Sequence, residues 1–249
     1  MLQNNRIKGK IADIKYDDTL NFFNNRANKY RKDNPYSVTM YQDNNPKLVE
    51  DRNKAETDKL LPYLNLDDTS VVLDIACGIG RWSDAIKTPI KFYYGMDFSK
   101  NLIDIANNRN TDTNRKFFVG SALDIEKIIE KHFLNKVNRI LLIGILMYLN
   151  DEDLSNLAQQ ILNVSDGKTI ICIREPIGLQ GRLTLQQFYS EELNDTYNAI
   201  YRSPEEIKKI FIDILIDGGF NISEEKYLFE DALNNRKETA QYYFILERK

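Results

Sequence analysis

The sequence is poor in the residues on which several common kinds of catalysis depend. Its 249 residues include one histidine, His132, and two cysteines, Cys77 and Cys172. Mechanisms of the Ser-His-Asp or Cys-His kind and multi-histidine metal sites therefore have little support, and we expect no metal. His132 stands near the end of a predicted helix, where a cation stabilises the helix dipole, and we interpret it as structural. We expect both cysteines to be buried free thiols in a reducing compartment.

Long apolar runs and an excess of positive charge are also missing. No uninterrupted apolar stretch approaches the about 20 residues that a membrane helix needs. Residues 1–15 mix charged and amide side chains without the apolar core of a signal peptide. The formal net charge is −3 and no long basic run is present, which argues against a binder of the nucleic-acid backbone. These absences predict a cytoplasmic protein without membrane insertion or a nucleic-acid partner, and they leave the oligomeric state open.

The most informative segment joins a short apolar run to a turn that contains two glycines. Val71–Ile75 reads as a buried strand, and the turn Ala76–Gly80 follows it directly. Glycines at Gly78 and Gly80 remove Cβ atoms where side chains would keep a ligand away from the backbone. The helix that begins at Arg81 presents its N-terminal amides to the same crevice. This segment therefore predicts a ligand site at the end of a strand.

Strands and helices alternate through the middle of the chain. Near-continuous apolar strands separated by helices predict a parallel sheet that is covered on both faces. After a helix that opens at Ser203 and ends at Gly218-Gly219, two final strands are predicted as a pair. The predicted strands are Val71–Ile75, Phe92–Met96, Lys116–Val119, Arg139–Ile143, Thr169–Ile173, Asn221–Phe229 and Ala240–Glu247, and the predicted helices between them are Arg81–Ile86, Ser99–Asn108, Leu123–Phe133 and Asp151–Val164.

The two ends of the chain and one internal segment differ from this pattern. Asp18 or Thr19 is predicted to cap a first helix, and Asn45 a second helix that runs from Pro46 to Leu61, with a loop at 33–44 between them. Asn150 with Asp153 resembles a capping box for the helix at 151–164. Residues 175–202 show no clear strand. We interpret residues 1–249 as one domain, with a helical cap at 1–62, a core at 63–174, an insertion at 175–203, and a helix and strand pair at 204–249.

At this point the chain resembles the class I S-adenosylmethionine-dependent methyltransferases over most of residues 71–249. Asp74–Gly80 looks like their first motif, Tyr94–Ser99 with Asp97 like their second, and Gly218–Phe220 precedes a terminal strand pair as in the family. The resemblance implies a Rossmann-like α/β fold, a doubly wound and mostly parallel sheet of seven strands with an antiparallel C-terminal hairpin. It also implies S-adenosylmethionine as cofactor, S-adenosylhomocysteine as product and a small-molecule substrate.

The resemblance further implies a place for each part of the cofactor. The glycine loop would hold the methionine portion, and Asp97 would accept hydrogen bonds from the two ribose hydroxyls. Residues 120–123 would flank the adenine, although the family often has an acid where Ser121 stands and a hydroxyl accepts more weakly. The predicted cofactor-binding residues are Asp74, Ala76, Cys77, Gly78, Gly80, Asp97, Phe98, Ser121, Ala122, Leu123, Ile143 and Tyr30.

Two segments resemble a narrower group, bacterial methyltransferases that modify sugars and capsule precursors. They are residues 34–46 with Arg52 and Glu56 following, and residues 174–176 with the later stretch 197–202. This likeness implies methylation of O or N on a nucleotide-linked sugar or capsular precursor, phosphoramidate groups included. Asn34-Pro35-Tyr36 also resembles part of an amino-methyltransferase signature, but we interpret it as a turn. The predicted substrate-binding residues are Tyr41, Gln42, Arg81, Arg174, Tyr189, Tyr197, Tyr201 and Arg202.

Methyl transfer needs in-line approach of the acceptor and exclusion of water, whereas a general base is needed only for some acceptors. A sugar hydroxyl requires a base, while a neutral amine or an anionic phosphoryl oxygen does not. Glu175 is the first candidate because it follows a strand at the carboxyl edge of the sheet, and an ion pair with a neighbouring arginine is its alternative role. Tyr148 and Asp43 are the other candidates for the base.

Two other functions remain open on the sequence alone. Gly78, Gly80 and Asp97 also fit a nicotinamide-dependent oxidoreductase, although Ser83 stands where the third glycine of that fingerprint belongs. A catalytically silent subunit that binds S-adenosylmethionine and supports a partner is the second alternative. Binding of labelled cofactor separates the first alternative from the methyltransferase, and turnover to S-adenosylhomocysteine excludes the second.

Overall fold

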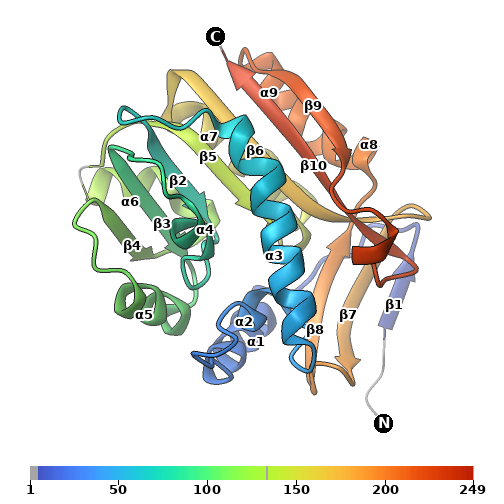
Figure 1. Ribbon diagram of the computed structural model, residues 1–249. Coiled ribbons are helices and arrows are strands. Elements are labelled where there is room, and N and C mark those ends of the chain that lie inside the picture. Colours follow the sequence, from blue (N-terminus) through green and yellow to red (C-terminus); the bar gives the residue numbers. More distant parts are fainter. Residues whose placement is uncertain (1–4, 133, 249) are drawn as a thin grey trace.

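A seven-stranded sheet forms the centre of the molecule in the computed structural model, which describes residues 5–132 and 134–248 (Figure 1). The strand order is β4-β3-β2-β5-β6-β10-β9, the first five strands run parallel, and β10 is antiparallel to both of its neighbours. The predicted α/β fold with an antiparallel C-terminal hairpin is therefore confirmed. The strands are β2 (Val71–Ile75), β3 (Phe92–Asp97), β4 (Arg115–Val119), β5 (Val137–Ile143), β6 (Ser165–Gly178), β9 (Asn221–Tyr227) and β10 (Thr239–Arg248).

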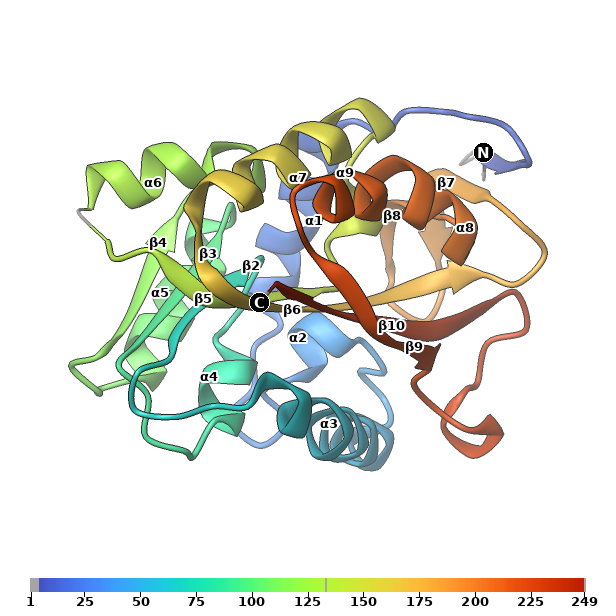
Figure 2. The ribbon, with the colours of Figure 1, turned by 90° about the horizontal axis from the view of Figure 1, so that it is seen from above.

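Helices cover both faces of this sheet (Figure 2). Alternate residues of β2 serve the two faces: Leu73 and Ile75 pack in one hydrophobic cluster and Val72 in the other. The first cluster includes side chains of α6 (Ile125–Lys131), α7 (Asp151–Val164) and α9 (Asp213–Asp217), and the second those of α3 (Pro46–Leu60), α4 (Arg81–Ala85) and α5 (Lys100–Arg109). A π-helical turn, Lys208–Ile212, joins α8 (Pro204–Ile207) to α9, and Ser203, where this helix was predicted to open, forms a capping box with Glu206.

A second, three-stranded antiparallel sheet corrects the prediction that residues 175–202 contain no strand. Its order is β1 (Asn5–Lys8), β7 (Leu183–Ser190) and β8 (Asp195–Tyr201), and β6 itself continues to Gly178. The alternation of apolar and polar residues in β7 is broken because Gln187 has φ of 51° and the pairing register shifts between Leu185 and Phe188. The extra length of β6 is paired with β10, a contact that is distant in the sequence.

The N-terminal part is helical, with limits that differ from those predicted. α1 (Tyr16–Asn28) begins three or four residues earlier than expected, with Lys15 at its N-cap, and the predicted loop contains a short helix, α2 (Ser37–Met40). Asn45 caps α3 as predicted, because its side chain accepts a hydrogen bond from the Leu48 N–H at 3.1 Å. Figure 1 shows α3 passing in front of the main sheet, beside the smaller one. The interpretation of residues 1–249 as one domain stays a prediction.

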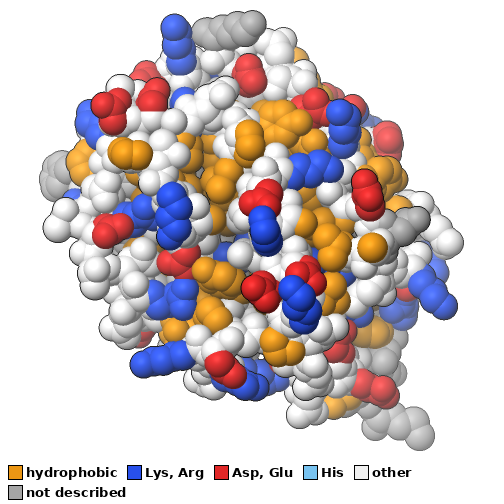
Figure 3. All heavy atoms as spheres, in the orientation of Figure 1, with side chains coloured by type: hydrophobic (Ala, Val, Ile, Leu, Met, Phe, Trp, Pro, Cys, Tyr) orange, Lys and Arg blue, Asp and Glu red, His pale blue; other side chains and the backbone are white. Residues whose placement is uncertain are grey.

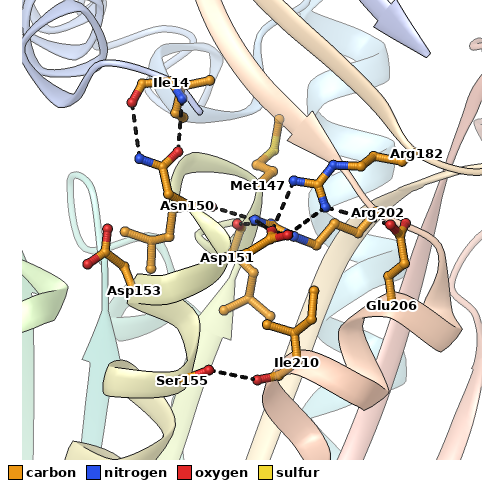
Figure 4. Close-up of polar contacts among 12 residues, drawn as sticks. Ile14, Met147, Asn150, Asp151, Asp153, Ser155, Arg182, Arg202, Glu206 and Ile210 are labelled. Atoms are coloured by element: carbon orange, nitrogen blue, oxygen red, sulfur yellow. Dashed lines mark hydrogen bonds and ion pairs between the residues drawn. The ribbon is translucent and has the colours of Figure 1, made fainter. Parts of the chain in front are cut away.

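The predicted capping box at Asn150 and Asp153 is wrong. The Asn150 side chain forms two hydrogen bonds with the backbone of Ile14, at 2.9 and 3.2 Å, and makes none to the first turn of α7 (Figure 4). Asp153 accepts a hydrogen bond from the phenol of Tyr16. Contacts between α7 and the start of α1 therefore replace the local cap.

His132 lies at the C-terminal end of α6, exposed and 4.3 Å from the ring of Phe118, as its structural interpretation predicts. The predicted end of that helix at Phe133 lies outside the described residues. Both cysteines are buried and unpaired. Within residues 5–132 and 134–248, no helix is long and apolar enough to cross a membrane.

Candidate active site

A cavity of about 400 Å³ lies at the carboxyl edge of the parallel strands. The turns after β2, β3, β4 and β5 form one side of it, and α1, the residues around Tyr41, the smaller sheet and residues 234–241 form the other. Open α/β sheets bind ligands at this edge, and the volume lies within the range of small-molecule sites. The cavity is therefore the candidate active site.

The glycine loop and the predicted ribose-binding acid are joined by hydrogen bonds. The N–H of Gly78 donates to one oxygen of Asp97 at 3.0 Å, and the N–H of Ser99 donates to the other at 2.9 Å. Gly78 has φ of 56°, and a Cβ there would lie 2.7 Å from Cγ2 of Thr39. Both the backbone conformation and this close approach favour glycine. The loop and Asp97 therefore form one preorganised wall of the cavity.

Asp97 is suited to accept hydroxyl groups. Its side chain lines the cavity although the residue is only 5% exposed. Burial raises the pKa of Asp97 to about 6, while the two backbone N–H groups act in the opposite direction. An ionised carboxylate has lone pairs left after accepting one N–H at each oxygen, so it can still bind a vicinal diol.

Eight of the twelve predicted cofactor residues line the cavity: Ala76, Gly78, Asp97, Phe98, Ser121, Ala122, Leu123 and Ile143. The hydroxyl of Ser121 accepts a hydrogen bond from the Leu123 N–H at 3.1 Å and caps the short helix Ala122–Asp124. This bond holds the predicted adenine-flanking segment at the rim of the cavity.

The other four, Asp74, Cys77, Gly80 and Tyr30, do not line the cavity. Asp74 is buried and accepts a hydrogen bond from Tyr93, and burial raises its pKa to about 7. Cys77 packs in the hydrophobic cluster of the α4 face, and Gly80, with φ of 81°, forms the N-cap of α4. The phenol of Tyr30 accepts a hydrogen bond from Arg109 at 3.2 Å. These residues shape the loop and its support from behind the cavity wall.

Tyrosines gather on the opposite side of the cavity. The phenols of Tyr41 and Tyr148 are hydrogen-bonded to each other, and those of Tyr197 and Tyr201 are 3.5 Å apart. All four line the cavity, and Phe23 meets Tyr148 edge to face at 5.1 Å. Burial raises the pKa of Tyr41 to about 12 and that of Tyr148 well above its usual value. These phenols are therefore neutral hydrogen-bonding groups at physiological pH.

The segment that carries Tyr41 is held in an unusual backbone conformation. Tyr41 and Gln42 have φ of 63° and 61°, a region that residues other than glycine rarely adopt. The buried guanidinium of Arg26 donates to the carbonyl of Val38 at 3.1 Å and to both oxygens of Asp43 at 2.6 Å. Asp43, one of the candidate bases, is thereby an anchor for this segment and does not line the cavity.

Glu175 lies outside the cavity lining, so its position does not favour the predicted role of general base. Its carboxylate accepts hydrogen bonds from the N–H groups of Ile145, Leu146 and Met147, at 2.7, 2.8 and 3.2 Å. The residue is 1% exposed and is absent from the cavity lining, and burial raises its pKa to about 7. A general base must reach the proton of its substrate. The geometry instead makes Glu175 a support for the turn Leu146–Tyr148, which carries Tyr148.

Arg202 holds the same turn from its carbonyl side. Its guanidinium donates to the carbonyls of Leu146 and Leu149, both at 2.7 Å, and to Asp151 at 2.6 Å. Arg182 donates to the same carboxylate at 3.0 Å (Figure 4). Arg202 does not line the cavity, so its predicted contact with substrate is not supported by its position.

Of the other predicted substrate-binding residues, some line the cavity and some do not. Tyr41, Gln42, Arg174, Tyr197 and Tyr201 line the cavity, whereas Arg81 and Tyr189 do not. Arg81 and Arg174 share the carboxylate of Glu56, at 2.5 and 3.0 Å, and the phenol of Tyr189 donates to Asn194 at 2.7 Å.

The prediction missed several wall residues. Arg52 and Glu56 stand four residues apart on α3, a spacing that places two side chains on one helix face, and both line the cavity. Both stand among the residues that carry the narrower resemblance, and their spacing could have indicated them as site residues as well. Residues 234–241 had no comparable signal. On the face shown in Figure 3, Lys and Arg side chains are interspersed with Asp and Glu over the surface around these elements.

Comparison with known proteins agrees with this geometry. Residues 72–166 match the family model of a methyltransferase domain. A stretch of 77 residues, 30% of the chain, is 40% identical to a probable cobalt-precorrin-6B C(15)-methyltransferase (decarboxylating) from Methanococcus maripaludis. The chain spans 41% of the length of that curated relative. The matched residues 72–166 contain the glycine loop and Asp97.

Solved structures share the fold over most of the chain. Magnesium protoporphyrin IX methyltransferase from Synechocystis PCC 6803 with bound S-adenosylmethionine has a TM-score of 0.61 at 16% identity, covering 96% of this chain and 100% of that one. A putative S-adenosylmethionine-dependent methyltransferase from Listeria monocytogenes has a TM-score of 0.60 at 15% identity, covering 80% and 98%. The chain therefore shares its fold with these methyltransferases, and the Synechocystis enzyme has been solved with S-adenosylmethionine and with S-adenosylhomocysteine bound.

Proposed function

We propose that this protein transfers a methyl group from S-adenosylmethionine to an oxygen or nitrogen atom of a small molecule. The observation that carries the proposal is the joined unit of Gly78 and Asp97, in which a loop with bare backbone and a carboxylate face one cavity. This unit lies within the matched methyltransferase domain. A buried acid with accepting capacity beside a glycine loop suits a ribose next to a charged methionine portion.

The residues present fit the cofactor. Ala76 and Gly78 would lie along its methionine portion, Asp97 would accept from its ribose hydroxyls, and Ser121–Leu123 would flank its adenine. When bound, the cofactor supplies an electrophilic methyl group on a sulfonium. The protein's contribution is to hold the acceptor in line and to keep water out, and positioning of this kind can remove about 7–11 kcal/mol from a barrier.

The cavity offers little general-base chemistry. The carboxylates that line it within the described part of the chain are Asp97, Glu56 and Glu238. Asp97 faces the expected ribose, and Glu56 is shared by two arginines, which hold its pKa below the usual value despite its burial. Glu238 is paired with Arg6 and Lys8, whose hydrogen bonds lower its pKa. The phenols around Tyr148 are neutral. An acceptor that needs no base, such as an amine or an anionic phosphoryl oxygen, therefore fits this site better than a hydroxyl.

For the acceptor itself, we propose a nucleotide-linked sugar or a capsular precursor, with phosphoramidate-type groups included. The wall opposite the glycine loop combines aromatic rings with hydrogen-bonding phenols, which suits a sugar, and it also carries arginines, which suit a phosphate. Nucleotide sugars and capsular precursors carry both features.

Binding and turnover test the proposal in two steps. Isothermal titration should show S-adenosylhomocysteine binding to the wild-type protein and loss of at least tenfold in affinity for Asp97→Asn, because a charged acceptor of two hydrogen bonds is removed. Ser121→Ala is the matched control at the same wall: it removes the cap of the short helix Ala122–Asp124 and one neutral acceptor but no charge, so its effect should be smaller. Methyl transfer from labelled S-adenosylmethionine to a panel of nucleotide sugars and phosphorylated precursors then tests the activity. Tight cofactor binding without turnover on any acceptor would favour the silent-subunit alternative.

A further inference from the structure

The acceptor side of the cavity contains more positive than negative side chains. Five cationic residues line it: Arg6 of β1, Arg52 of α3, Arg174 of β6, and Arg236 and Lys237 before β10. Two carboxylates line the same side, Glu56 and Glu238. Five charges against two leave an excess of three. The elements that supply these cations line the same cavity as the predicted cofactor residues, but none of these elements contains one of those residues.

Arg52 is the cation in this group whose partners are all neutral among the described residues. Its Nε and Nη2 donate to the carbonyl of Leu233 at 2.9 and 2.6 Å, and Nη2 donates to the amide oxygen of Asn235 at 2.8 Å. Its guanidinium also lies 6.0 Å from the centre of the Phe229 ring. These contacts fix the orientation of the guanidinium and leave its charge unbalanced.

The surroundings of Arg52 oppose its charge. Burial lowers the pKa of Arg52, and the nearby charges of Arg236 and Arg174 lower it further. Glu192, whose charge favours the cation, is already paired with Arg236 at 2.6 Å. A half-buried cation held among like charges costs free energy that an incoming anion would recover. The arrangement thus prepares a place for a negative group.

We propose that the acceptor carries a phosphoryl group, which binds at Arg52 together with Arg236 and Lys237. This inference rests on the proposed function, since it assigns the anionic end of the acceptor for that methyl transfer. Glu192 does not line the cavity but pairs with Arg236, and subtracting its charge from the excess of three leaves two positive charges. A phosphate monoester carries about −1.5 to −2 at neutral pH and so matches this remaining charge. A sugar carboxylate carries one charge and would leave the site unbalanced. Because Nε and Nη2 of Arg52 donate to Leu233 and Asn235, Nη1 is the nitrogen with which Arg52 would donate a charge-assisted hydrogen bond to a phosphate oxygen.

Titration with simple anions tests the inference. The protein saturated with S-adenosylhomocysteine is titrated, at constant ionic strength, with inorganic pyrophosphate, glucose 1-phosphate and glucuronate. We expect glucose 1-phosphate and pyrophosphate to bind at millimolar or lower concentration and glucuronate to bind at least tenfold more weakly. Arg52→Gln should weaken phosphate binding on the order of tenfold or more, the effect of losing one charge-assisted contact, and should leave the affinity for S-adenosylhomocysteine within about twofold.

Arg139→Gln is the matched control. Arg139 is also half-buried and also donates to backbone carbonyls, those of Leu64, Asn65 and Asn138, but it lies outside the cavity lining. It should leave phosphate binding unchanged. Equal effects of the two variants, equal binding of glucuronate, or no binding of either phosphate probe would each overturn the inference. Failure of the wild type to bind S-adenosylhomocysteine would instead overturn the proposed function, so the two failures are distinguishable.

Discussion

Replacing Glu175 by Gln distinguishes a supporting role of this residue from a catalytic one. One carboxylate oxygen accepts from the N–H groups of Ile145 and Leu146, and the other accepts from that of Met147. A glutamine can keep the first oxygen but turns an NH₂ group toward the Met147 N–H. The variant therefore loses one hydrogen bond, leaves a buried donor unsatisfied and weakens the other two bonds.

The magnitude follows from these changes. A hydrogen bond to a charged group contributes about 1.5–3 kcal/mol, and an unsatisfied buried donor costs about 1–3 kcal/mol. Relief from burying the charge offsets part of this loss, because burial raises the pKa of Glu175 to about 7 and so disfavours the ionised form. We expect the free energy of unfolding to fall by about 1–3 kcal/mol in urea denaturation, a loss within the usual range for a broken buried network.

The kinetics of the Glu175→Gln variant decide between the supporting and the catalytic role. If Glu175 supports the turn, KM should rise because Tyr148 shifts, and the pH profile of kcat/KM should keep its shape. Arg202→Gln, which frees the same turn from its carbonyl side, should give the same pattern. The reasoning is refuted if Glu175→Gln keeps wild-type stability and cofactor affinity but loses turnover together with a pH limb near 7, as removal of a general base would produce.

Three further predictions concern the cavity walls. Burial raises the pKa of Asp97 to about 6, and the ribose is expected to bind the ionised form. The Kd for S-adenosylhomocysteine should therefore stay constant above pH 6 and rise by up to tenfold per pH unit below it. Titration calorimetry between pH 5 and 8 checks this, and Asp97→Asn should abolish the dependence. Gly78→Ala should lower the free energy of unfolding by about 1–2 kcal/mol, because alanine disfavours the positive φ of this position. The new Cβ would also meet Cγ2 of Thr39, and adding Thr39→Ser, which removes that methyl group, should recover the steric part of the loss. Urea denaturation of the single and double variants measures both effects, and equal stability of wild type and Gly78→Ala would contradict the prediction. Tyr148→Phe removes the hydrogen bond to Tyr41, but it removes no general base because burial keeps this phenol neutral. Steady-state kinetics should show a raised KM with kcat lowered by less than tenfold. Complete loss of turnover would show instead that the phenol takes part in the chemistry.

Local patterns in the sequence were sufficient for the core. The limits of Val71–Ile75 and Asp151–Val164 agree with the structure, because a continuous apolar run and a 3.6-residue period are properties of the segment itself. The glycine loop was predicted from its own pattern and Asp97 from the resemblance to the family's second motif, and the structure joins the two through the Gly78 N–H. The alternation of elements predicted the parallel sheet, and the resemblance to the methyltransferases implied the antiparallel hairpin. The order of the strands came from the structure.

Tertiary structure alone decided what the polar side chains do. The sequence could not show that three N–H groups surround Glu175 or that Arg202 binds two carbonyls, because these partners lie about 30 to 56 residues away along the chain. The smaller sheet was hidden for the same reason, as β1 pairs with β7 across most of the chain and a bulge breaks the pattern of β7. The sequence by itself therefore determined the framework and its glycine loop. The tertiary structure determined which charged side chains remain available to a substrate, because the burial and hydrogen bonding of a charged group depend on the segments that fold against it.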